Sequence, residues 1–201
     1  MKSKNISAIL CLIVVCAGCG QRPTINKLDA SSVVLAFGDS LTYGTGAVVG
    51  ESYPEVLEDL IGCRVINEGV PGETTTKGLR RLPRVLNEIE PGLVILCHGG
   101  NDMLKRQSQT KTIANLEAMI VMIKEADVDV VLIGVPKPSL LLKTPEFYKE
   151  LADKYQIPFD GDTIPEIIAK RSLKSDRIHP NAEGYKKLAQ AILDLLKKSQ
   201  Q

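Results

Sequence analysis

Short apolar runs that end at glycine or proline recur along this chain, and they limit its possible folds more than any other feature. Val33–Phe37 is apolar at every position and precedes Gly38, and Leu93–Cys97 is equally apolar and stops just before Gly99. Runs without polar residues at alternate positions are typical of parallel strands buried on both faces. The other predicted strands are Arg64–Asn67, which ends at Gly69, Val128–Val135, which ends at Pro136, and the weaker Ile157–Phe159.

Apolar stripes with helical spacing separate these strands. They are Pro54–Ile61, Leu79–Ile89 with Pro83 as a kink or a start, Ile113–Ile123, Pro145–Tyr155 and a last helix from the N-cap Asn181 to Leu196. Strands that alternate with helices in this way predict an α/β fold. We expect three α/β/α layers around a flavodoxin-like, doubly wound parallel sheet of about five strands.

Length and charge narrow the classes of function. A chain of 201 residues suits one domain with an appendage. Its 25 basic and 24 acidic residues leave no excess charge to attract nucleic acid, so we expect no nucleic-acid partner. We also expect a monomer. A composition that is 44% hydrophobic and 24% charged excludes a disordered chain and a protein with several membrane spans.

The N-terminus reads as an export signal. Lys2 and Lys4 precede a mostly apolar run, Ile6–Cys16, whose 11 residues are too few to cross a bilayer core of about 30 Å at about 1.5 Å per residue. A basic start, a short apolar stretch and small residues are typical of a secretory signal. We therefore divide the chain into a lipoprotein-type signal peptide (1–18), a tether (19–31) and a folded domain (32–201).

The lipoprotein assignment depends on Cys19. Ala17 and Gly18 before it resemble a bacterial lipoprotein cleavage site, which implies that Cys19 carries the lipid that anchors the protein to a membrane. Cys16 stands where that site more often has leucine. Two alternatives remain: a CxxC pair of Cys16 and Cys19, and cleavage without lipid, which would give a soluble periplasmic or secreted protein.

Chemically capable residues follow the predicted strands. In a doubly wound fold the carboxyl ends of the strands share one rim, where ligands bind. The segments there are Gly38–Thr42, Asn67–Thr74 and Gly99–Asp102, and a further polar segment, Asp176–Pro180, precedes the last helix.

These segments can supply nucleophilic catalysis. The hydroxyl of Ser40 needs a base, and of the two histidines His179 has a carboxylate, Asp176, three residues earlier to orient its ring. Gly72 and Asn101 can donate hydrogen bonds to a developing oxyanion. Taken singly, each residue fits a cap, a turn or a loop as well. His98, the alternative base, we interpret as a packing or rim residue.

The combined blocks resemble the SGNH (GDSL-type) hydrolases. They are Gly38-Asp39-Ser40, Asn67–Thr74 with Gly72, Gly99–Asp102 and Asp176–Pro180, supported by Ser52-Tyr53-Pro54 and Gly78–Pro83. Within that family the chain is similar to bacterial periplasmic esterases with thioesterase, arylesterase and lysophospholipase activity. It has neither a Gly-x-Ser-x-Gly elbow nor a metal-ligand spacing such as HExxH.

The resemblance implies a serine esterase that acts on a carboxylic ester or thioester through an acyl-enzyme. Ser40 would be the nucleophile, His179 the base and Asp176 its partner. The N–H groups of Ser40 and Gly72 and the amide of Asn101 would form the oxyanion hole. The resemblance implies no cofactor and no metal. A carbohydrate or peptidoglycan O-deacetylase of the same family and a non-catalytic lipoprotein binding module are the alternatives.

Two expectations concern the surroundings of the site. The loops Met103–Thr112 and Lys137–Thr144 should wall the substrate pocket, where Leu140-Leu141-Leu142 would suit a short or medium acyl chain or serve in packing. Cys63 precedes one strand and Cys97 ends another, so in a parallel sheet they lie at opposite rims and should stay unpaired.

Overall fold

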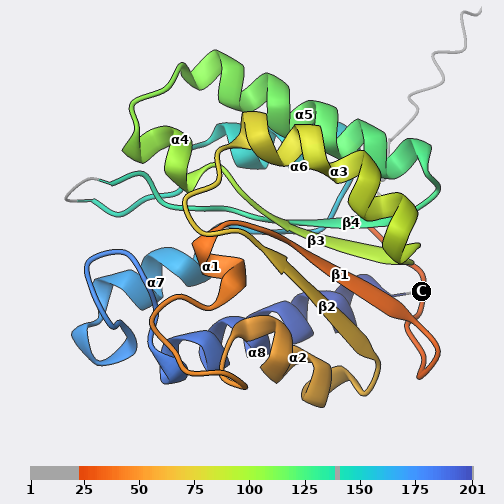
Figure 1. The fold of residues 1–201 in the computed structure, drawn as a ribbon, viewed down its shortest axis with the longest axis horizontal. Helices are drawn as coiled ribbons and strands as arrows, with labels where there is room; N and C mark the ends of the chain where they lie inside the picture. The colour runs from red at the N-terminus through yellow and green to blue at the C-terminus, as the bar shows by residue number, and fades with distance from the viewer. Residues whose placement is uncertain (1–22, 139–140, 201) are drawn as a thin grey trace, which may run out of the picture.

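The structure is a computed structural model that describes residues 23–138 and 141–200. Its centre is a five-stranded sheet in the order β2-β1-β3-β4-β5, and all strand pairs are parallel. The strands are β1 (Val33–Gly38), β2 (Arg64–Gly69), β3 (Leu93–Cys97), β4 (Asp129–Ile133) and β5 (Phe159–Asp160). This confirms the predicted α/β fold with a doubly wound parallel sheet (Figure 1).

Helices cover both faces of this sheet. In Figure 1, α3, α5 and α6 lie on one side and α2, α7 and α8 on the other, which gives the three predicted layers. None of the helices described is both long and apolar enough to cross a membrane. The helices are α1 (Ser40–Tyr43), α2 (Tyr53–Ile61), α3 (Thr75–Ile89), α4 (Gly100–Leu104), α5 (Gln109–Glu125), α6 (Phe147–Tyr155), α7 (Thr163–Ala169) and α8 (Ala182–Ser199), with a 3₁₀ turn at Arg171–Leu173.

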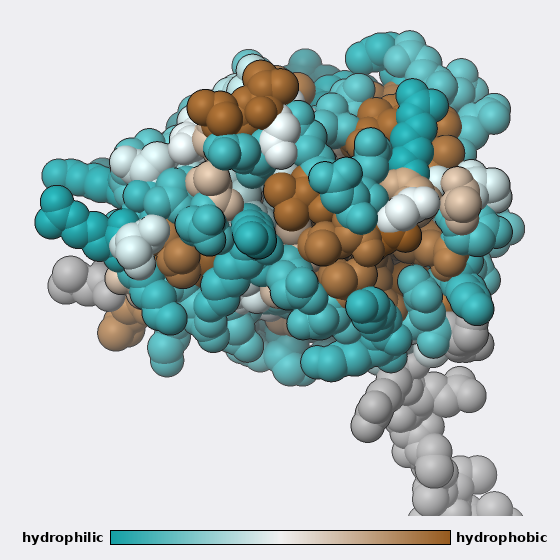
Figure 2. All heavy atoms as spheres, turned by 90° about the horizontal axis from the view of Figure 1, so that it is seen from below, coloured by the Kyte–Doolittle hydropathy of each residue, from teal (hydrophilic) through white to brown (hydrophobic). Residues whose placement is uncertain are grey.

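The core is built mainly from aliphatic side chains, together with several fully buried tyrosine and phenylalanine rings. The central strands β1 and β3 are buried from Val34 and Leu93 onward, as their continuous apolar runs predict. α8 turns Leu188, Ile192 and Leu196 inward, and Asn181 caps it by accepting a hydrogen bond from the Gly184 N–H. The outer face of the layer that contains α2, α7 and α8 is mostly hydrophilic, with apolar patches over part of it (Figure 2).

The register of the strands places their carboxyl ends together. Gly38, the last residue of β1, is in register with Gly69 of β2 and with Cys97 of β3. The segments that follow these strands therefore all begin at the carboxyl ends of the strands, on one side of the sheet. Cys63 and Cys97 are buried free thiols, which confirms that they do not pair with each other. Cys63 lies just before the amino end of β2, and Cys97 lies at the carboxyl end of β3.

The last two strands are shorter than the sequence indicates. β4 is Asp129–Ile133 rather than Val128–Val135, and β5 is Phe159–Asp160 rather than Ile157–Phe159. Pro158, directly before β5, has no N–H to donate to the ladder, and the last hydrogen bond from the β4 side is that of the Gly134 N–H to the Asp160 carbonyl at 2.7 Å. The edge strand β5 pairs only with Leu132 and Ile133 of β4.

Part of the predicted tether lies on the domain. Ile25 is 4% exposed, and its N–H donates to the carbonyl of Ser199 at 2.8 Å. The Asn26 N–H donates to the Asp129 carboxylate at 2.7 Å. Residues 25 and 26 are thus docked rather than free, because burial of Ile25 removes apolar surface from water. The signal peptide (1–18) and Cys19 lie outside the described residues.

Candidate active site

Ser40 stands at the turn where β1 gives way to α1. It is the first residue of α1, and the side chain of Asp39 caps this helix by accepting from the Leu41 N–H at 3.1 Å. A side chain at Gly38 would not fit, because its Cβ would lie 2.2 Å from the Cys97 carbonyl oxygen. Glycine therefore lets the turn approach β3 closely.

His179 is held by the carboxylate that precedes it. Its Nδ1 lies 2.7 Å from Asp176 Oδ2, and Asp176 Oδ1 accepts the N–H groups of Ile178 and His179 at 2.8 and 2.9 Å. Partial burial by itself would raise the pKa of Asp176, but these hydrogen bonds outweigh it and hold that pKa below its usual value. Asp176 therefore remains an ionised hydrogen-bond acceptor at neutral pH.

Ser40 and His179 meet across a sequence separation of 139 residues. His179 Nε2 lies 3.0 Å from Ser40 Oγ. The ionised Asp176 can only accept, so the proton on the neutral imidazole is at Nδ1 and Nε2 is free to accept from the Ser40 hydroxyl. The three side chains thus form one hydrogen-bonded chain in which a proton can pass from Ser40 to His179.

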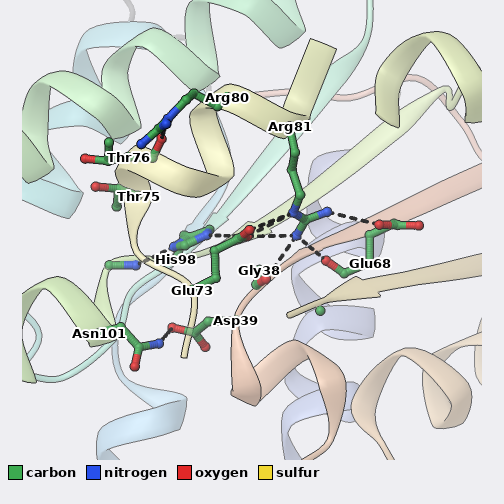
Figure 3. Close-up of polar contacts among 12 residues, drawn as sticks. Gly38, Asp39, Glu68, Glu73, Thr75, Thr76, Arg80, Arg81, His98 and Asn101 are labelled. Atoms are coloured by element: carbon green, nitrogen blue, oxygen red, sulfur yellow. Dashed lines mark hydrogen bonds and ion pairs between the residues drawn. The ribbon is translucent and has the colours of Figure 1, made fainter. Parts of the chain in front are cut away.

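Asn101 belongs to the same site, on α4. Its Nδ2 donates to Asp39 Oδ2 at 3.0 Å, which fixes the side-chain amide beside the turn that carries Ser40 (Figure 3). Burial raises the pKa of the Asp39 carboxyl above its usual value.

Gly72 lies in the loop between β2 and α3, and it is not among the residues that line the cleft beside Ser40. Its φ of +75° is in the region that favours glycine. Lys105 Nζ donates to its carbonyl at 2.8 Å, which links this loop to the end of α4.

A cleft of about 340 Å³ opens beside Ser40, Asn101 and His179. Most of its walls are apolar. The expected loops contribute in part: Leu104 comes from the first, and Lys137, Pro138 and Leu142 come from the second. Leu141 points away and is 75% exposed, while Leu140 lies outside the described residues. The remaining lining residues are Asp39, Leu41, Gly100, Val135, Pro136, Ile164, Ile168, Arg177 and Ile178.

α7 is the part of the cleft that the sequence analysis missed. Ile164 and Ile168 of this helix line the cleft and are almost fully buried. The spacing of Ile164, Ile167 and Ile168 is helical, but Pro165 beside them obscured the pattern, although proline is tolerated in a first helical turn.

His98 is fully buried, so it packs inside the molecule and does not lie on the rim. Both of its ring nitrogens have partners: Nδ1 accepts from the Gly99 N–H at 3.1 Å, and Nε2 lies 3.2 Å from Glu73 Oε2. Residues 23–138 and 141–200 contain no cluster of three His, Cys, Asp or Glu side chains that could hold a metal ion.

The family model for the GDSL-like lipase/acylhydrolase family matches residues 36–187, a stretch that includes Ser40, Asn101, Asp176 and His179. The chain belongs to this family. This confirms the resemblance seen in the sequence, and the acylhydrolase is therefore an enzyme that cleaves carboxylic esters.

Individual relatives agree with this assignment. The acylhydrolase is 30% identical over 181 residues to an arylesterase of Vibrio mimicus, which covers 85% of this chain and 90% of the relative. It is 27% identical over 166 residues to thioesterase 1/protease 1/lysophospholipase L1 of Escherichia coli (strain K12), covering 79% and 80%. Among solved structures, the SGNH-hydrolase family esterase AlinE4 is similar with a TM-score of 0.62 and 34% identity over 86% of this chain and 98% of that one.

Proposed function

We propose that Ser40 is the nucleophile of this acylhydrolase, His179 its general base and Asp176 the residue that orients His179. The observation that carries this proposal is the chain of hydrogen bonds from Asp176 Oδ2 through His179 to Ser40 Oγ, at 2.7 and 3.0 Å. An alcohol becomes an effective nucleophile when a positioned base removes its proton in the transition state.

The reaction then takes two steps. Ser40 Oγ attacks the carbonyl carbon while its proton moves to His179 Nε2, and the tetrahedral intermediate collapses when His179 returns the proton to the leaving alcohol or thiol. The acyl group stays on Ser40 as an ester. A water molecule attacks this ester with His179 again as base, which releases the carboxylic acid and restores the Ser40 hydroxyl.

The oxyanion hole comprises the backbone N–H groups of Ser40 and Gly72 and the side-chain amide of Asn101. The Ser40 N–H is at the start of α1, where the backbone N–H groups have no helical partner. The Asn101 amide has two N–H bonds, and Asp39 accepts one of them, so the other remains available for the substrate oxygen. For Gly72 the support is its place in the segment Asn67–Thr74, which resembles the second block of the family.

The lining of the cleft supports an acyl chain as the group bound there. Leu104, Leu142, Ile164 and Ile168 offer apolar surface, and burial of each methylene against it contributes about 0.8 kcal/mol. We therefore propose that the substrates are carboxylic esters or thioesters with a short or medium acyl chain. The names of the Vibrio and Escherichia relatives support arylesters, thioesters and lysophospholipids as the classes to test.

A substrate panel tests this assignment. Purified protein is assayed with p-nitrophenyl esters of increasing chain length, acyl-CoA, lysophospholipid and an acetylated sugar, with the Ser40→Ala variant as the background. We expect the highest kcat/KM for apolar acyl chains of short or medium length. A clear preference for the acetylated sugar would replace this proposal by the O-deacetylase alternative.

We also propose that the enzyme is exported, with residues 1–18 as the signal peptide, and is held on a membrane by lipid on Cys19. The order of Ala17, Gly18 and Cys19 after an apolar run supports this proposal. The folded domain (32–201) would then act as a monomer at the membrane surface, facing the periplasm if the cell has an outer membrane. Cleavage without lipid, giving a soluble periplasmic or secreted enzyme, is the alternative.

A further inference from the structure

A buried cluster of charged and polar side chains forms around Glu73, the residue that follows Gly72 (Figure 3). Its members are Glu73, Arg81 and His98, whose side chains are only 6%, 15% and 0% exposed. None of them takes part in the reaction steps described above. Because burial of charge is costly unless it is paired, such a cluster calls for an explanation.

Arg81, on α3, joins that helix to the ends of two strands. Its Nε lies 3.0 Å from both carboxylate oxygens of Glu73, and its Nη1 lies 3.0 Å from Glu68 Oε2. Its Nη2 donates to the carbonyls of Glu68 and Gly38 at 2.6 and 3.3 Å, where β2 and β1 end. The planar guanidinium also lies over the Phe37 ring, 4.0 Å from its centroid.

Glu73 extends this connection to β3. Since His98 Nδ1 accepts from the Gly99 N–H, the imidazole proton is on Nε2 and points to Glu73 Oε2, 3.2 Å away. The Tyr148 hydroxyl donates to the His98 carbonyl at 2.7 Å and holds that end of the network. Burial alone would raise the pKa of Glu73, but His98 and Arg81 outweigh it and keep this pKa below its usual value.

Gly78 gives independent support for the place of His98. It lies inside α3, where glycine costs about 1 kcal/mol relative to alanine. A Cβ on Gly78 would lie 2.5 Å from His98 Nε2 and 3.4 Å from Glu73 Oε2. Glycine is therefore needed at this position of α3, because any side chain would collide with the imidazole where it meets Glu73.

Gly72 is held mainly through its neighbours, because it is the third residue of a turn that the Glu73 N–H closes on the Val70 carbonyl at 3.1 Å. A Cβ built on it would meet nothing within 4 Å, and glycine is the residue with the greatest backbone freedom. Its own carbonyl also accepts from Lys105 Nζ at 2.8 Å. The next residue is Glu73, whose carboxylate is fixed at once to α3 and to the end of β3.

We propose that Glu73 is a positioning residue, clamped by Arg81 and His98, that holds the Gly72 N–H in the direction needed by the oxyanion. This inference rests on the proposed role of Gly72 in the oxyanion hole. An oxyanion donor acts only if its direction is fixed before the charge develops. Loss of the clamp therefore weakens transition-state binding and leaves ground-state binding in the apolar cleft unchanged.

The test compares Glu73→Gln and Arg81→Lys with the wild-type enzyme. Glu88→Gln is the matched control, because Glu88 forms an ion pair with Arg84 on the same helix at 2.6 Å, but both side chains are exposed. For Glu73→Gln we expect kcat to fall roughly 10- to 100-fold, less than for complete loss of an oxyanion donor, with KM changed less than about 2-fold. Arg81→Lys keeps the charge but loses the planar fork, so kcat should fall in the same direction. Glu88→Gln should match the wild type.

A second measurement separates positioning from mere stability. An alkyl boronic acid forms a tetrahedral, anionic adduct with a serine hydroxyl, so its inhibition constant should rise in parallel with the loss of kcat. A wild-type kcat and inhibition constant in folded Glu73→Gln, even with a lower Tm, would overturn the inference. If Glu73→Gln does not fold, the same criteria apply to Arg81→Lys. Full activity of Ser40→Ala, measured alongside, would instead overturn the proposed function.

Discussion

At the scale of the residue, Ser40 owes its position to neighbours that take no part in bond breaking. Gly38 lets the chain pass close to β3, and Asp39 caps α1. The proposed base, His179, then reaches the Ser40 hydroxyl from the far end of the sequence. The side chain of Ser40 itself makes no contact on which the fold depends. Function and stability are therefore separable at this position.

Replacement of Ser40 by alanine tests this separation. We expect kcat to fall by roughly 10⁴- to 10⁶-fold, because removal of a serine nucleophile leaves only the contributions of the oxyanion hole and substrate binding. The Tm should change by no more than a few degrees, as measured by circular dichroism. Near-normal ester hydrolysis by the pure variant would remove Ser40 from the mechanism.

Asn101 differs because its amide would bind charge that exists only in the transition state. Asn101→Ala should lower kcat by roughly 10²- to 10³-fold with a smaller change in KM. Steady-state kinetics with one p-nitrophenyl ester measures both constants. An increase in KM alone would mean that Asn101 positions the substrate and does not stabilise an oxyanion.

At the scale of the element, α7 sets one wall of the cleft, and its side chains should control the length of acyl chain accepted. Ile164→Phe adds volume in this wall, so kcat/KM should fall at least about 10-fold for the longest ester accepted and change little for the acetyl ester, at a cost in stability of about 1–3 kcal/mol. The control is Leu141→Phe, at an exposed position outside the cleft. An equal loss with all chain lengths would show that α7 does not contact the acyl chain.

The buried cluster joins α3 to the sheet, and its electrostatics predict how stability depends on pH. The folded-state pKa of Glu73 lies below the ordinary value of 4.5, so its contribution to stability is complete above that value and is lost as the pH falls through the folded-state pKa. The unfolding free energy of wild type should exceed that of Glu73→Gln at pH 7, and the gap should narrow below about pH 4.5. Chemical denaturation of both proteins across this pH range measures the difference in unfolding free energy. A difference that does not depend on pH would contradict the prediction.

The same elements show what could be predicted from the sequence. The apolar runs of β1 and β3 have no period-2 alternation because both faces are covered, and this feature was sufficient to predict them. The edge strand β5 and the short helix α7 carry weaker local patterns, and the structure corrected the first and added the second.

The site divides in the same way. Ser40, Asp176 and His179 could be proposed from the sequence because their residue types limit the chemistry, and the structure brings the three side chains within hydrogen-bond distance of one another. The contact of Arg81 with Glu73 could not be predicted from the sequence. Charged side chains in a helix and in a loop give no local sign that they are buried together. His98 was accordingly expected to lie on the rim as readily as inside, whereas it is fully buried.

At the scale of the whole molecule, the proposed lipid on Cys19 determines where the enzyme works. A side-chain charge of nearly zero gives the domain no electrostatic attraction to a membrane, whereas each buried lipid methylene contributes about 0.8 kcal/mol. Cys19→Ser should therefore move activity from the membrane fraction to the soluble fraction or block processing of the leader. Fractionation of cells with an esterase assay measures it. Wild-type enzyme that is already soluble, with an N-terminus other than Cys19, would favour the secreted alternative.

The contacts of Ile25 and Asn26 place the start of the folded domain on the opposite side from the cleft. Asn26 binds Asp129, the first residue of β4, so the chain enters the domain near the amino ends of the strands, while Ser40 and the cleft lie beyond the carboxyl ends. The lipid proposed on Cys19 would be attached on the entry side, so the mouth of the cleft would face away from the membrane. Molecules that diffuse through the surrounding compartment would then reach the cleft directly, whereas lipids of the anchoring membrane would reach it only after the whole domain reorients.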